Sequence, residues 1–532
     1  MKLHRTPKSE VVERVRAILD RKGLTLYQVS LRTQNLYGRS SPYFVPHNLY
    51  YELDVGTFSP SLHQLLALSK ISKYRFNDWL RVFGFSPERI PELQLLLPSK
   101  RTMVLDSTVD DPESWIPWFR NKPGPREAPS IAPLGQFIEL SEARRLRSFQ
   151  VDSDSFIYAK VGRQDVLAFP NLLPGSIVRV NTKITKTLAP RNASPDCLFL
   201  LEHAAGFCCC RLQALGEGRV LPLSTHLPYA QVELKLHEEA RILGVLDLEI
   251  RPLIARVQPE VPRALARYWK PLSLPPEQVK LSRLLRNARS RMGLSFREAS
   301  VLSRRIASEL GDEQYFAAPG SLSDYETQDA PPRHVQKVIT LCAIYGLHFS
   351  TFLKSSDLHS QDAGQEPIPD NLVPRKTPTK FQKNRKEFNQ FSGQQLLELL
   401  RRWEPVPFFL RNLLPELSGL KSLSLHDFFW VGDEQKPLHP LLVNGLILII
   451  NRHKKKPIYS RSHPLWQQPL YVVLKRDGTY ICGCCSLEND VLVIHSYSPA
   501  YLQPEKLRNH DDAEVVGLVV TVARRLNGPS LS

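Results

Sequence analysis

The 532-residue sequence contains no apolar run of the roughly 20 residues that a membrane-spanning helix needs. The best candidate, LLVNGLILII at residues 441–450, is about half that length and is typical of a buried strand. The first residues, MKLHRTPKSEVVERV, carry charge but lack the apolar stretch of a secretory signal. We therefore expect a cytoplasmic protein that makes no contact with a membrane.

Cysteine is scarce, with 8 residues in the whole chain, and it is not distributed as a disulfide framework would be. Six of the eight stand in two short runs, GFCCC at residues 206–210 and ICGCC at residues 481–485. Such crowding indicates reduced thiols. Zinc sites usually take pairs of ligands from separate knuckles with C-x₂₋₄-C spacing, which these runs do not provide.

The two cysteine runs are predicted to lie on strands. Alternation then places Cys208 and Cys210 on one face and Cys209 on the other, and it places Cys482 and Cys484 opposite Cys485. Because cysteine packs as a small hydrophobic side chain, we expect core positions and no cofactor or metal. The alternatives are a thiol sensor, or a metal shared between the two runs.

The charge balance is strongly basic, with 70 Lys and Arg against 53 Asp and Glu, a formal net charge of +17. An excess of this size favours an anionic partner, most often nucleic acid, although it is equally compatible with solubility alone. The length suggests three or four domains, and 42% hydrophobic with 23% charged residues is typical of a soluble globular chain.

The chain contains an internal repeat, in which the second half of the sequence restates the first. GLTLYQVS at residues 23–30 recurs as GLSFREAS at 293–300, and ARILGVLDLEI at 240–250 recurs as AEVVGLVVTVA at 513–523. Gly162, Pro170 and Gly175 recur with the same mutual spacing at Gly432, Pro440 and Gly445. The repeat predicts two alternating modules in this order: helical copy 1 (8–98), a linker (99–134), β copy 1 (135–257), helical copy 2 (276–356), a basic linker (357–389) and β copy 2 (390–527).

Each helical module is predicted to begin with an amphipathic helix that ends at Gly23 or Gly293. Thr25 and Ser295 are suitable N-caps for the second helix. A short third helix ends near Glu52 or Glu326, and two more helices follow a proline-containing turn.

This order resembles the lambda-repressor-like (Cro/Xre) helix-turn-helix family, over most of each helical copy. Ser323-Asp324-Tyr325-Glu326 matches the end of that family's recognition helix, and Tyr51-Glu52 matches it less fully. The sequence departs from the family in having Leu26 or Phe296 directly after the cap and an insert before the third helix.

The resemblance implies binding of double-stranded DNA, with the start of the third helix in the major groove. It implies base-facing roles for His47, Asn48 and Tyr50 in copy 1 and for Ser321, Ser323 and Asp324 in copy 2. Arg39, Arg304 and Arg305 would neutralise phosphates. The structural alternative is that Tyr51 and Tyr325 are core residues and that the arginines form an ordinary solvated surface.

The β modules consist of short apolar runs separated by Gly, Pro and Asn. Over most of their length, they resemble the C-terminal domain of LexA and CI-type repressors, the self-cleaving serine-lysine family. The family's serine would fall at Gln164 or Leu167 in copy 1 and at Glu434 or Pro437 in copy 2, and its lysine near Cys210 and Cys484. Because a serine is a poor nucleophile without such a base and neither residue is present, we expect no enzymatic activity.

The sequence thus predicts an α+β multidomain protein, with two all-α helix-turn-helix domains alternating with two mostly-β LexA-like domains. We expect a transcriptional regulator that binds two unlike DNA half-sites as a covalent pseudo-dimer, with the two β modules paired within the chain. Further self-association is left open. The alternatives are a protein-interaction scaffold built on remodelled helix-turn-helix domains and, less consistent with the missing dyad, a self-cleaving repressor.

Overall fold

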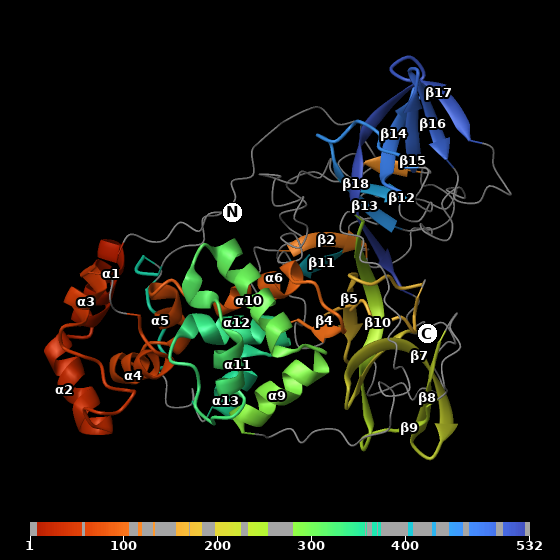
Figure 1. Cartoon of the computed structure of the whole chain (residues 1–532). Helices are drawn as coiled ribbons and strands as arrows, with labels where there is room; N and C mark the ends of the chain where they lie inside the picture. Colours follow the sequence, from red (N-terminus) through yellow and green to blue (C-terminus); the bar gives the residue numbers. More distant parts are fainter. Residues whose placement is uncertain are drawn as a thin grey trace. The chain divides into compact units, whose positions relative to one another are not determined.

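The computed structural model contains both helices and a large antiparallel sheet, so the chain has an α+β fold (Figure 1). Two compact units are present. The helical unit comprises Met1–Leu97, Val104–Val109 and Pro275–Pro378, and the β unit comprises Pro98–Met103, Asp110–Leu274 and Thr379–Ser532. The structure describes residues 8–55, 59–105, 115–119, 131–133, 156–169, 171–183, 197–224, 232–253, 280–356, 358, 364–369, 371–373, 403–407, 428–431, 446–460, 468–495 and 504–526.

Both copies of the helical module contain the three predicted helices followed by two more, and copy 1 adds a final 3₁₀ turn and helix, which were not predicted. Copy 1 contains α1 (Lys8–Asp20), α2 (Leu26–Tyr37), α3 (Leu49–Val55), α4 (Leu62–Ser72), α5 (Phe76–Val82), the 3₁₀ turn η1 (Pro87–Arg89) and α6 (Ile90–Leu96). Copy 2 contains α9 (Leu281–Arg291), α10 (Phe296–Leu310), the 3₁₀ turn η7 (Glu313–Tyr315), α11 (Pro319–Tyr325), α12 (Val335–Tyr345) and α13 (Phe349–Ser355).

The predicted caps start the second helix of each copy. Thr25 and Ser295 each accept a hydrogen bond from the backbone N–H three residues on, and Gln28 or Glu298 accepts one from the cap backbone N–H. These reciprocal bonds satisfy donors that a helix start otherwise leaves without partners. Gly23 and Gly293 before the caps have φ of +61° and +65°, a region that glycine enters without a steric penalty.

The two helical modules contact each other inside the helical unit. Helix α6 of copy 1 packs against α12 of copy 2 (Figure 1), and Gln94 Nε2 donates to the Cys342 carbonyl at 3.5 Å. Residues 364–368, in the range expected to be the second linker, bond to the α4–α5 corner of copy 1. There the Arg75 N–H donates to the Glu366 carbonyl at 2.8 Å, and the Ile368 N–H donates to Asp78 Oδ2 at 3.0 Å.

The β unit contains the strands of both β modules. Those of copy 1 are β4 (Phe156–Lys160), β5 (Ile177–Asn181), β6 (Phe199–His203), β7 (Gly206–Gly216), β8 (Arg219–Leu223), β9 (Leu234–Lys235) and β10 (Ala240–Pro252). Those of copy 2 are β12 (Phe428–Val431), β13 (Leu446–Asn451), β14 (Leu470–Lys475), β15 (Tyr480–Glu488), β16 (Val491–His495), β17 (Glu505–Arg508) and β18 (Ala513–Arg525). The range expected as the first linker contains β1 (Met103–Val104), β2 (Trp115–Phe119) and β3 (Ile131–Pro133), and β2 pairs with β11 (Trp403–Pro407).

The two β modules join through their last strands. Strand order along the main sheet is β17-β16-β15-β14-β18-β10-β6-β7-β8-β9, so β18 and β10 meet at the middle (Figure 1). Their register pairs Ile250 with Ala523, Glu249 with Arg524 and Arg251 with Val522. Because the sequence repeat makes Ile250 equivalent to Ala523 and likewise relates the flanking pairs, this pairing is isologous, with a local twofold axis at Ile250 and Ala523.

A buried charge cluster breaks that symmetry. Glu249 is fully buried, and its carboxylate accepts from Ser176 Oγ at 2.7 Å and from Arg251 Nε at 3.1 Å. Arg524, the repeat equivalent of Arg251, donates to the same carboxylate from across the strand pair. Burial acts to raise the pKa of Glu249, but the two guanidinium groups and the hydrogen bonds outweigh it and hold the pKa at about 2. Val522 occupies the equivalent position of copy 2, so one carboxylate serves two related arginines.

The cysteine runs lie on β7 and β15 and face the core. Cys208 and Cys210 belong to one buried cluster, with their sulfur atoms 4.0 Å apart, whereas Cys482 and Cys484 lie in a different cluster from Cys485. The predicted alternation and core burial are therefore confirmed. Burial raises the thiol pKa of Cys208, Cys209, Cys482 and Cys485, which keeps these thiols protonated.

Within the described ranges, no single helix is long and apolar enough to cross a membrane. Helices α12 and α13 reach that length and composition only as a pair bent by 115°. Most side chains of α12 are buried inside the helical unit.

Candidate nucleic-acid interface

A buried hydroxyl positions the segment before the third helix in both copies. Ser303 Oγ of α10 accepts from the Ala317 N–H at 3.0 Å, and Thr33 Oγ1 of α2 accepts from the Val45 N–H at 3.2 Å. Thr33 and Ser303 are equivalent in the repeat and also donate to the equivalent carbonyls of Ser30 and Ser300. The inserts in both copies therefore return to the same place on the second helix.

Copy 2 has one more residue than copy 1 after this point. Val45 is followed directly by Pro46, whereas Ala317 is followed by Ala318 and then Pro319. Because of this extra residue, the third helix of copy 2 is shifted by one position relative to the pair Val45 and Ala317. The buried Leu49 of copy 1 is therefore equivalent to the buried Leu322 of copy 2. The residue buried four positions later is Leu53 in copy 1 and Glu326 in copy 2. The sequence-based match of Tyr51-Glu52 to Tyr325-Glu326 is thus wrong by one residue.

Glu326 fixes the end of α11 on α9 through a buried ion pair. Its two carboxylate oxygens accept from Arg289 Nε at 2.7 Å and Arg289 Nη2 at 2.9 Å, and the Tyr345 hydroxyl lies 3.3 Å from Oε1. Hydrogen bonding to Glu326 raises the pKa of Arg289. A bidentate pair of this kind sets orientation as well as distance, so α11 is held in one position on its module.

Copy 1 has no such ion pair at the equivalent positions. Arg289 corresponds to Leu19 and Glu326 to Leu53, and both leucines are buried. Glu52, in contrast, accepts from Asn48 Nδ2 at 2.8 Å in an exposed bond. Apolar packing therefore holds α3 in place, and the bond between Asn48 and Glu52 joins two surface residues at the start of α3.

The outward surface of the second helix differs most between the copies. On α10 the exposed side chains include Arg297, Val301, Arg304 and Arg305. Their equivalents on α2, also exposed, are Tyr27, Leu31, Gln34 and Asn35. Copy 2 thus has three cations where copy 1 has a tyrosine and two amides.

The predicted base-facing residues of copy 2 lie on one short helix. Asp324 is exposed, and Ser321 and Ser323 are partly buried. Gly320 is exposed, and a Cβ there would meet no atom within 4 Å, so the start of α11 is sterically open. Tyr325, for which a core position was the alternative, is partly buried, and burial raises its pKa.

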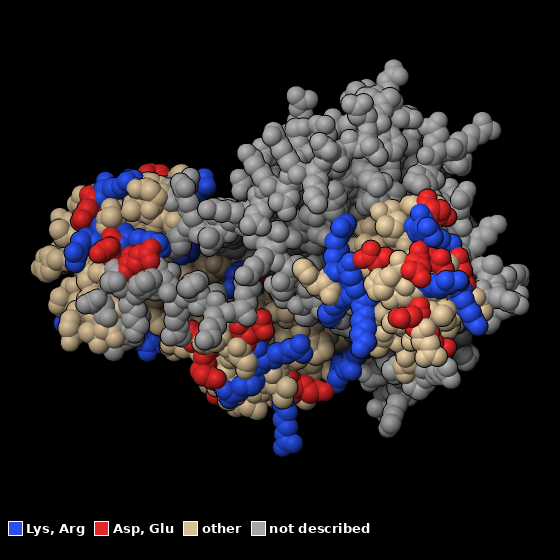
Figure 2. Space-filling view, turned by 90° about the horizontal axis from the view of Figure 1, so that it is seen from above, with Lys and Arg blue, Asp and Glu red and all other residues tan. Residues whose placement is uncertain are grey.

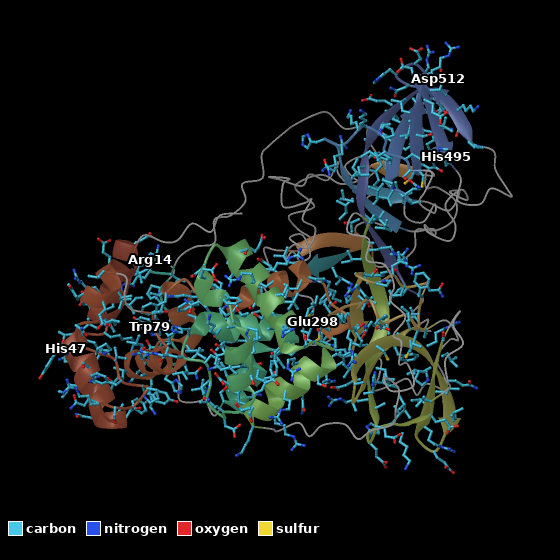
Figure 3. The ribbon with its side chains drawn as sticks, in the orientation of Figure 1. Arg14, His47, Trp79, Glu298, His495 and Asp512 are labelled. Carbon is cyan, nitrogen blue, oxygen red and sulfur yellow. The ribbon has the colours of Figure 1, made fainter. Side chains whose placement is uncertain are left out.

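The predicted base-facing residues of copy 1 are larger and more aromatic. His47 and Asn48 are exposed just before α3, and Figure 3 shows His47 pointing away from the ribbon. Tyr50 is partly buried under the guanidinium of Arg16, 5.0 Å from the ring centroid, and burial raises its pKa to about 12. Tyr51 is 70% exposed, so a core role for it is wrong.

The three predicted phosphate-binding arginines are not equivalent. Arg304 pairs with Glu313 and lies over the Phe316 ring at 3.5 Å, so its charge is already engaged. Arg305 is exposed on α10, and Arg39 is exposed in the turn after α2. Arg297, for which the resemblance predicted no role, is also exposed, in the first turn of α10. Figure 2 shows acidic side chains lying beside basic ones on the described part of the face in view.

The resemblance to LexA-type domains predicted positions for a serine and a lysine, and the described residues at these positions are Gln164, Leu167, Cys210 and Cys484. Leu167 and Cys210 pack in the same buried cluster, and Cys484 is buried in copy 2. Gln164, the other choice for the serine position in copy 1, uses its N–H to bond the Lys100 carbonyl at 2.8 Å. Glu434 and Pro437 lie outside the described residues.

The described residues contain no group of three or more His, Cys, Asp or Glu side chains that could hold a metal ion. Comparison of the chain with family models, with curated proteins and with solved structures gives no match.

Proposed function

We propose that the chain is a transcriptional regulator that binds double-stranded DNA as a single-chain pseudo-dimer, and that copy 2 makes most of the phosphate contacts. The observation that carries this proposal is the pairing of a fixed helix with exposed cations. Arg289 and Glu326 hold α11 in place, and Arg297 and Arg305 are exposed on the preceding helix α10. In helix-turn-helix proteins, the first of these helices crosses the DNA backbone and the second enters the major groove.

The arrangement of the modules supports the pseudo-dimer. The two helical modules contact each other through α6 and α12, and the two β modules pair isologously through β10 and β18. Dimeric helix-turn-helix proteins use such twofold pairing to address two half-sites about one helical turn apart. In this proposal the LexA-like β domains alternate with the helical domains, serve pairing and perform no catalysis.

The two copies then read unlike half-sites. Ser321, Ser323 and Asp324 offer small hydrogen-bonding groups, and Asp324 would accept from cytosine N4. His47 and Asn48 offer a ring and an amide for adenine, and Tyr51, which is exposed where the predicted Tyr50 is partly buried, offers a ring for apolar contact with thymine methyl groups. Because copy 1 lacks the arginines of α10, its binding depends less on salt than that of copy 2.

A second candidate function, a protein-interaction scaffold, is favoured by one observation on copy 1. Tyr27, Tyr51 and Val55 are 68%, 70% and 52% exposed, and Leu31 is 44% exposed. Exposed apolar and aromatic side chains at this density are more typical of protein interfaces than of phosphate-contacting surfaces.

Selection of bound duplexes from a random library with full-length protein distinguishes the two functions. We expect one motif with two spaced half-sites, and we expect Arg297→Ala with Arg305→Ala to abolish the half-site read by copy 2. The matched change in copy 1, Tyr27→Ala with Asn35→Ala, removes the other half-site if copy 1 reads DNA. Failure to enrich any sequence, at low as well as near-physiological salt, would overturn DNA binding and favour the scaffold.

The chain is also proposed to lack the self-cleaving activity of LexA-type proteins, because the predicted serine position holds Gln164 or Leu167 and the predicted lysine position holds Cys210, so the serine nucleophile and its lysine base are both absent. Alkaline incubation followed by mass spectrometry of the intact chain tests this. Fragments cut near residues 100–135 or 360–390 would contradict it.

A further inference from the structure

A short segment that follows α6 in the chain is seated on copy 1 of the β module. The N–H groups of Arg163 and Gln164 donate to the carbonyls of Ser99 and Lys100 at 3.1 and 2.8 Å. Arg101 Nη1 donates to the Ala205 carbonyl at 2.6 Å, and Thr102 forms an antiparallel bridge with Phe207. Residues 99–102 therefore lie between the loop 162–165 and the β6–β7 hairpin.

Gly162 permits this close approach. A Cβ added there would lie 2.2 Å from the Arg101 carbonyl carbon and 2.5 Å from the Thr102 nitrogen, closer than atoms can pack. The Gly162 N–H also donates to Thr102 Oγ1 at 3.1 Å. The loop is thus shaped to hold the backbone of this segment rather than its side chains alone.

A buried carboxyl group ties the segment to β7. Asp165 is 4% exposed, and its Oδ2 accepts from the Thr102 hydroxyl and from the Cys209 N–H, the latter at 2.9 Å. Oδ1 is buried without a hydrogen-bond partner. Burial raises the pKa of Asp165 to about 7, although the bonds from Thr102 and Cys209 act to lower it.

The surroundings do not neutralise an ionised Asp165. From β7, the Cys208 and Cys209 thiols act on it and stay protonated because burial raises their pKa. Arg101, on the seated segment, directs its guanidinium to a carbonyl, and Glu249 adds a further negative charge near Cys209. Arg163 lies in the same loop as Asp165, but the groups that most influence the carboxyl are the neutral Thr102 and Cys209.

We propose that residues 99–102 form a latch that is closed while Asp165 is neutral and opens when Asp165 ionises. An ionised carboxylate in this site is buried among neutral groups, and release of the segment admits water to it. Opening adds four residues, up to about 14 Å of extended chain, to the connection that follows α6. The latch would thereby adjust the reach between modules, and it does not depend on whether the chain binds DNA.

The direction of the pH dependence follows from the raised pKa. The closed latch has its full stability below the ordinary aspartate pKa near 3.8 and loses it as pH rises through about 7. Between pH 6 and pH 8 the open population should rise about tenfold, because ionisation favours the open form by a factor of about 100 over this range and the closed form, whose carboxyl is half ionised near pH 7, by a factor of about 10.

Trypsin provides a direct test, because Lys100 and Arg101 are cleavage sites inside the latch. Full-length protein is digested briefly at pH 6, 7 and 8, and cleavage after residues 100 and 101 is quantified by mass spectrometry. Asp165→Asn keeps an oxygen acceptor for Thr102 and Cys209 but cannot ionise. Dividing the wild-type rate by the Asp165→Asn rate at each pH removes the pH dependence of trypsin itself.

We expect this ratio to rise about tenfold between pH 6 and pH 8. Gly162→Ala should unseat the segment, so that cleavage at these two sites is fast at every pH, while circular dichroism verifies that the fold is retained. A ratio that stays flat would overturn the proposal, as would slow cleavage of Gly162→Ala. If Asp165→Asn does not fold, the slope of the wild-type rate, divided by that of Gly162→Ala, decides the question in the same way.

Discussion

The two copies of the helical module bury different chemistry at the same place. Copy 2 holds its third helix with the Arg289–Glu326 ion pair, whereas copy 1 has Leu19 and Leu53 at the equivalent positions. Both pairs are compatible with a stable module, because a buried ion pair and an apolar pair of similar volume often contribute similar stability. The two pairs differ in how strictly they set the orientation of the third helix. The bidentate ion pair fixes the angle of α11, whereas contact between two leucines has no preferred direction.

The β modules show the same contrast with the copies exchanged. Here copy 1 supplies the buried carboxylate, Glu249, and copy 2 has Val522. The two arginines next to them, Arg251 and Arg524, are retained in both copies and share Glu249. A duplicated chain therefore needs only one of two symmetry-related charges, provided that the copies stay paired.

The largest expected effect is the loss of the shared carboxylate. Glu249→Gln removes the negative charge that two arginines at the junction share, and we expect it to cost about 3–5 kcal/mol of unfolding free energy in the β unit. Glu238→Gln, which removes an exposed partner of Lys235, is the matched control and should cost less than about 1 kcal/mol. Equal effects in urea unfolding would show that Glu249 does not hold the two β modules together.

Acid provides the same test without a mutation. The lowered pKa of Glu249 contributes stability that is present above its ordinary value of 4.5 and is lost as pH falls toward about 2. The loss should amount to about 3 kcal/mol and should be absent in Glu249→Gln.

Breaking the ion pair of copy 2 should rank next. Arg289→Leu leaves Glu326 buried without a cation and is expected to cost about 3 kcal/mol or more. The double change Arg289→Leu with Glu326→Leu reproduces the chemistry of copy 1 and should recover most of this loss. Far-ultraviolet circular dichroism during urea unfolding measures both variants. A double variant as unstable as the single one would show that the leucines of copy 1 rely on other packing.

Exchanging the exposed residues of the second helices should change DNA binding and leave stability unchanged. Arg297→Tyr gives copy 2 the residue of copy 1, and Tyr27→Arg does the reverse. If Arg297 contacts a phosphate, the slope of log affinity against log salt should fall by about 0.9 in the first variant. It should rise by a similar amount in the second. An unchanged slope in both would place the DNA contact elsewhere.

Much of the local structure could be predicted from the sequence because it depends on neighbouring residues. The caps Thr25 and Ser295 start their helices, and the alternation of Cys208, Cys209 and Cys210 follows from strand geometry. The residue-by-residue alignment of the two third helices could not be predicted. A Tyr-Glu pair occurs in both helices, and the extra residue Ala318 places the pair of copy 2 one position away from that of copy 1. Only burial distinguishes Leu53 from Glu52.

The buried carboxylates could not be predicted from the sequence either. Asp165, Glu249 and Glu326 look like surface residues in the one-dimensional pattern, since isolated carboxylates are rarely buried. Each is buried by partners far along the chain, respectively Thr102, Arg524 and Arg289. Register between strands and packing between helices decide such contacts, and neither has a local signature.

The smallest expected effect concerns Arg304, the cation of copy 2 that is already engaged. Arg304→Gln gives α10 the side chain that α2 has at Gln34. Its partner Glu313 is 74% exposed, and Arg304 itself is 49% exposed, so the ion pair is solvated and should contribute less than about 0.5 kcal/mol. Removal of Arg304 leaves the Glu313 carboxylate without this partner, and a carboxylate repels phosphate, so the variant should not gain affinity. We therefore expect a salt slope close to that of the wild type, in contrast to Arg297→Tyr. A reduction as large as that of Arg297→Tyr, measured in the same titration, would mean that Arg304 leaves Glu313 to contact a phosphate and that the basic surface of copy 2 extends across the whole outward face of α10.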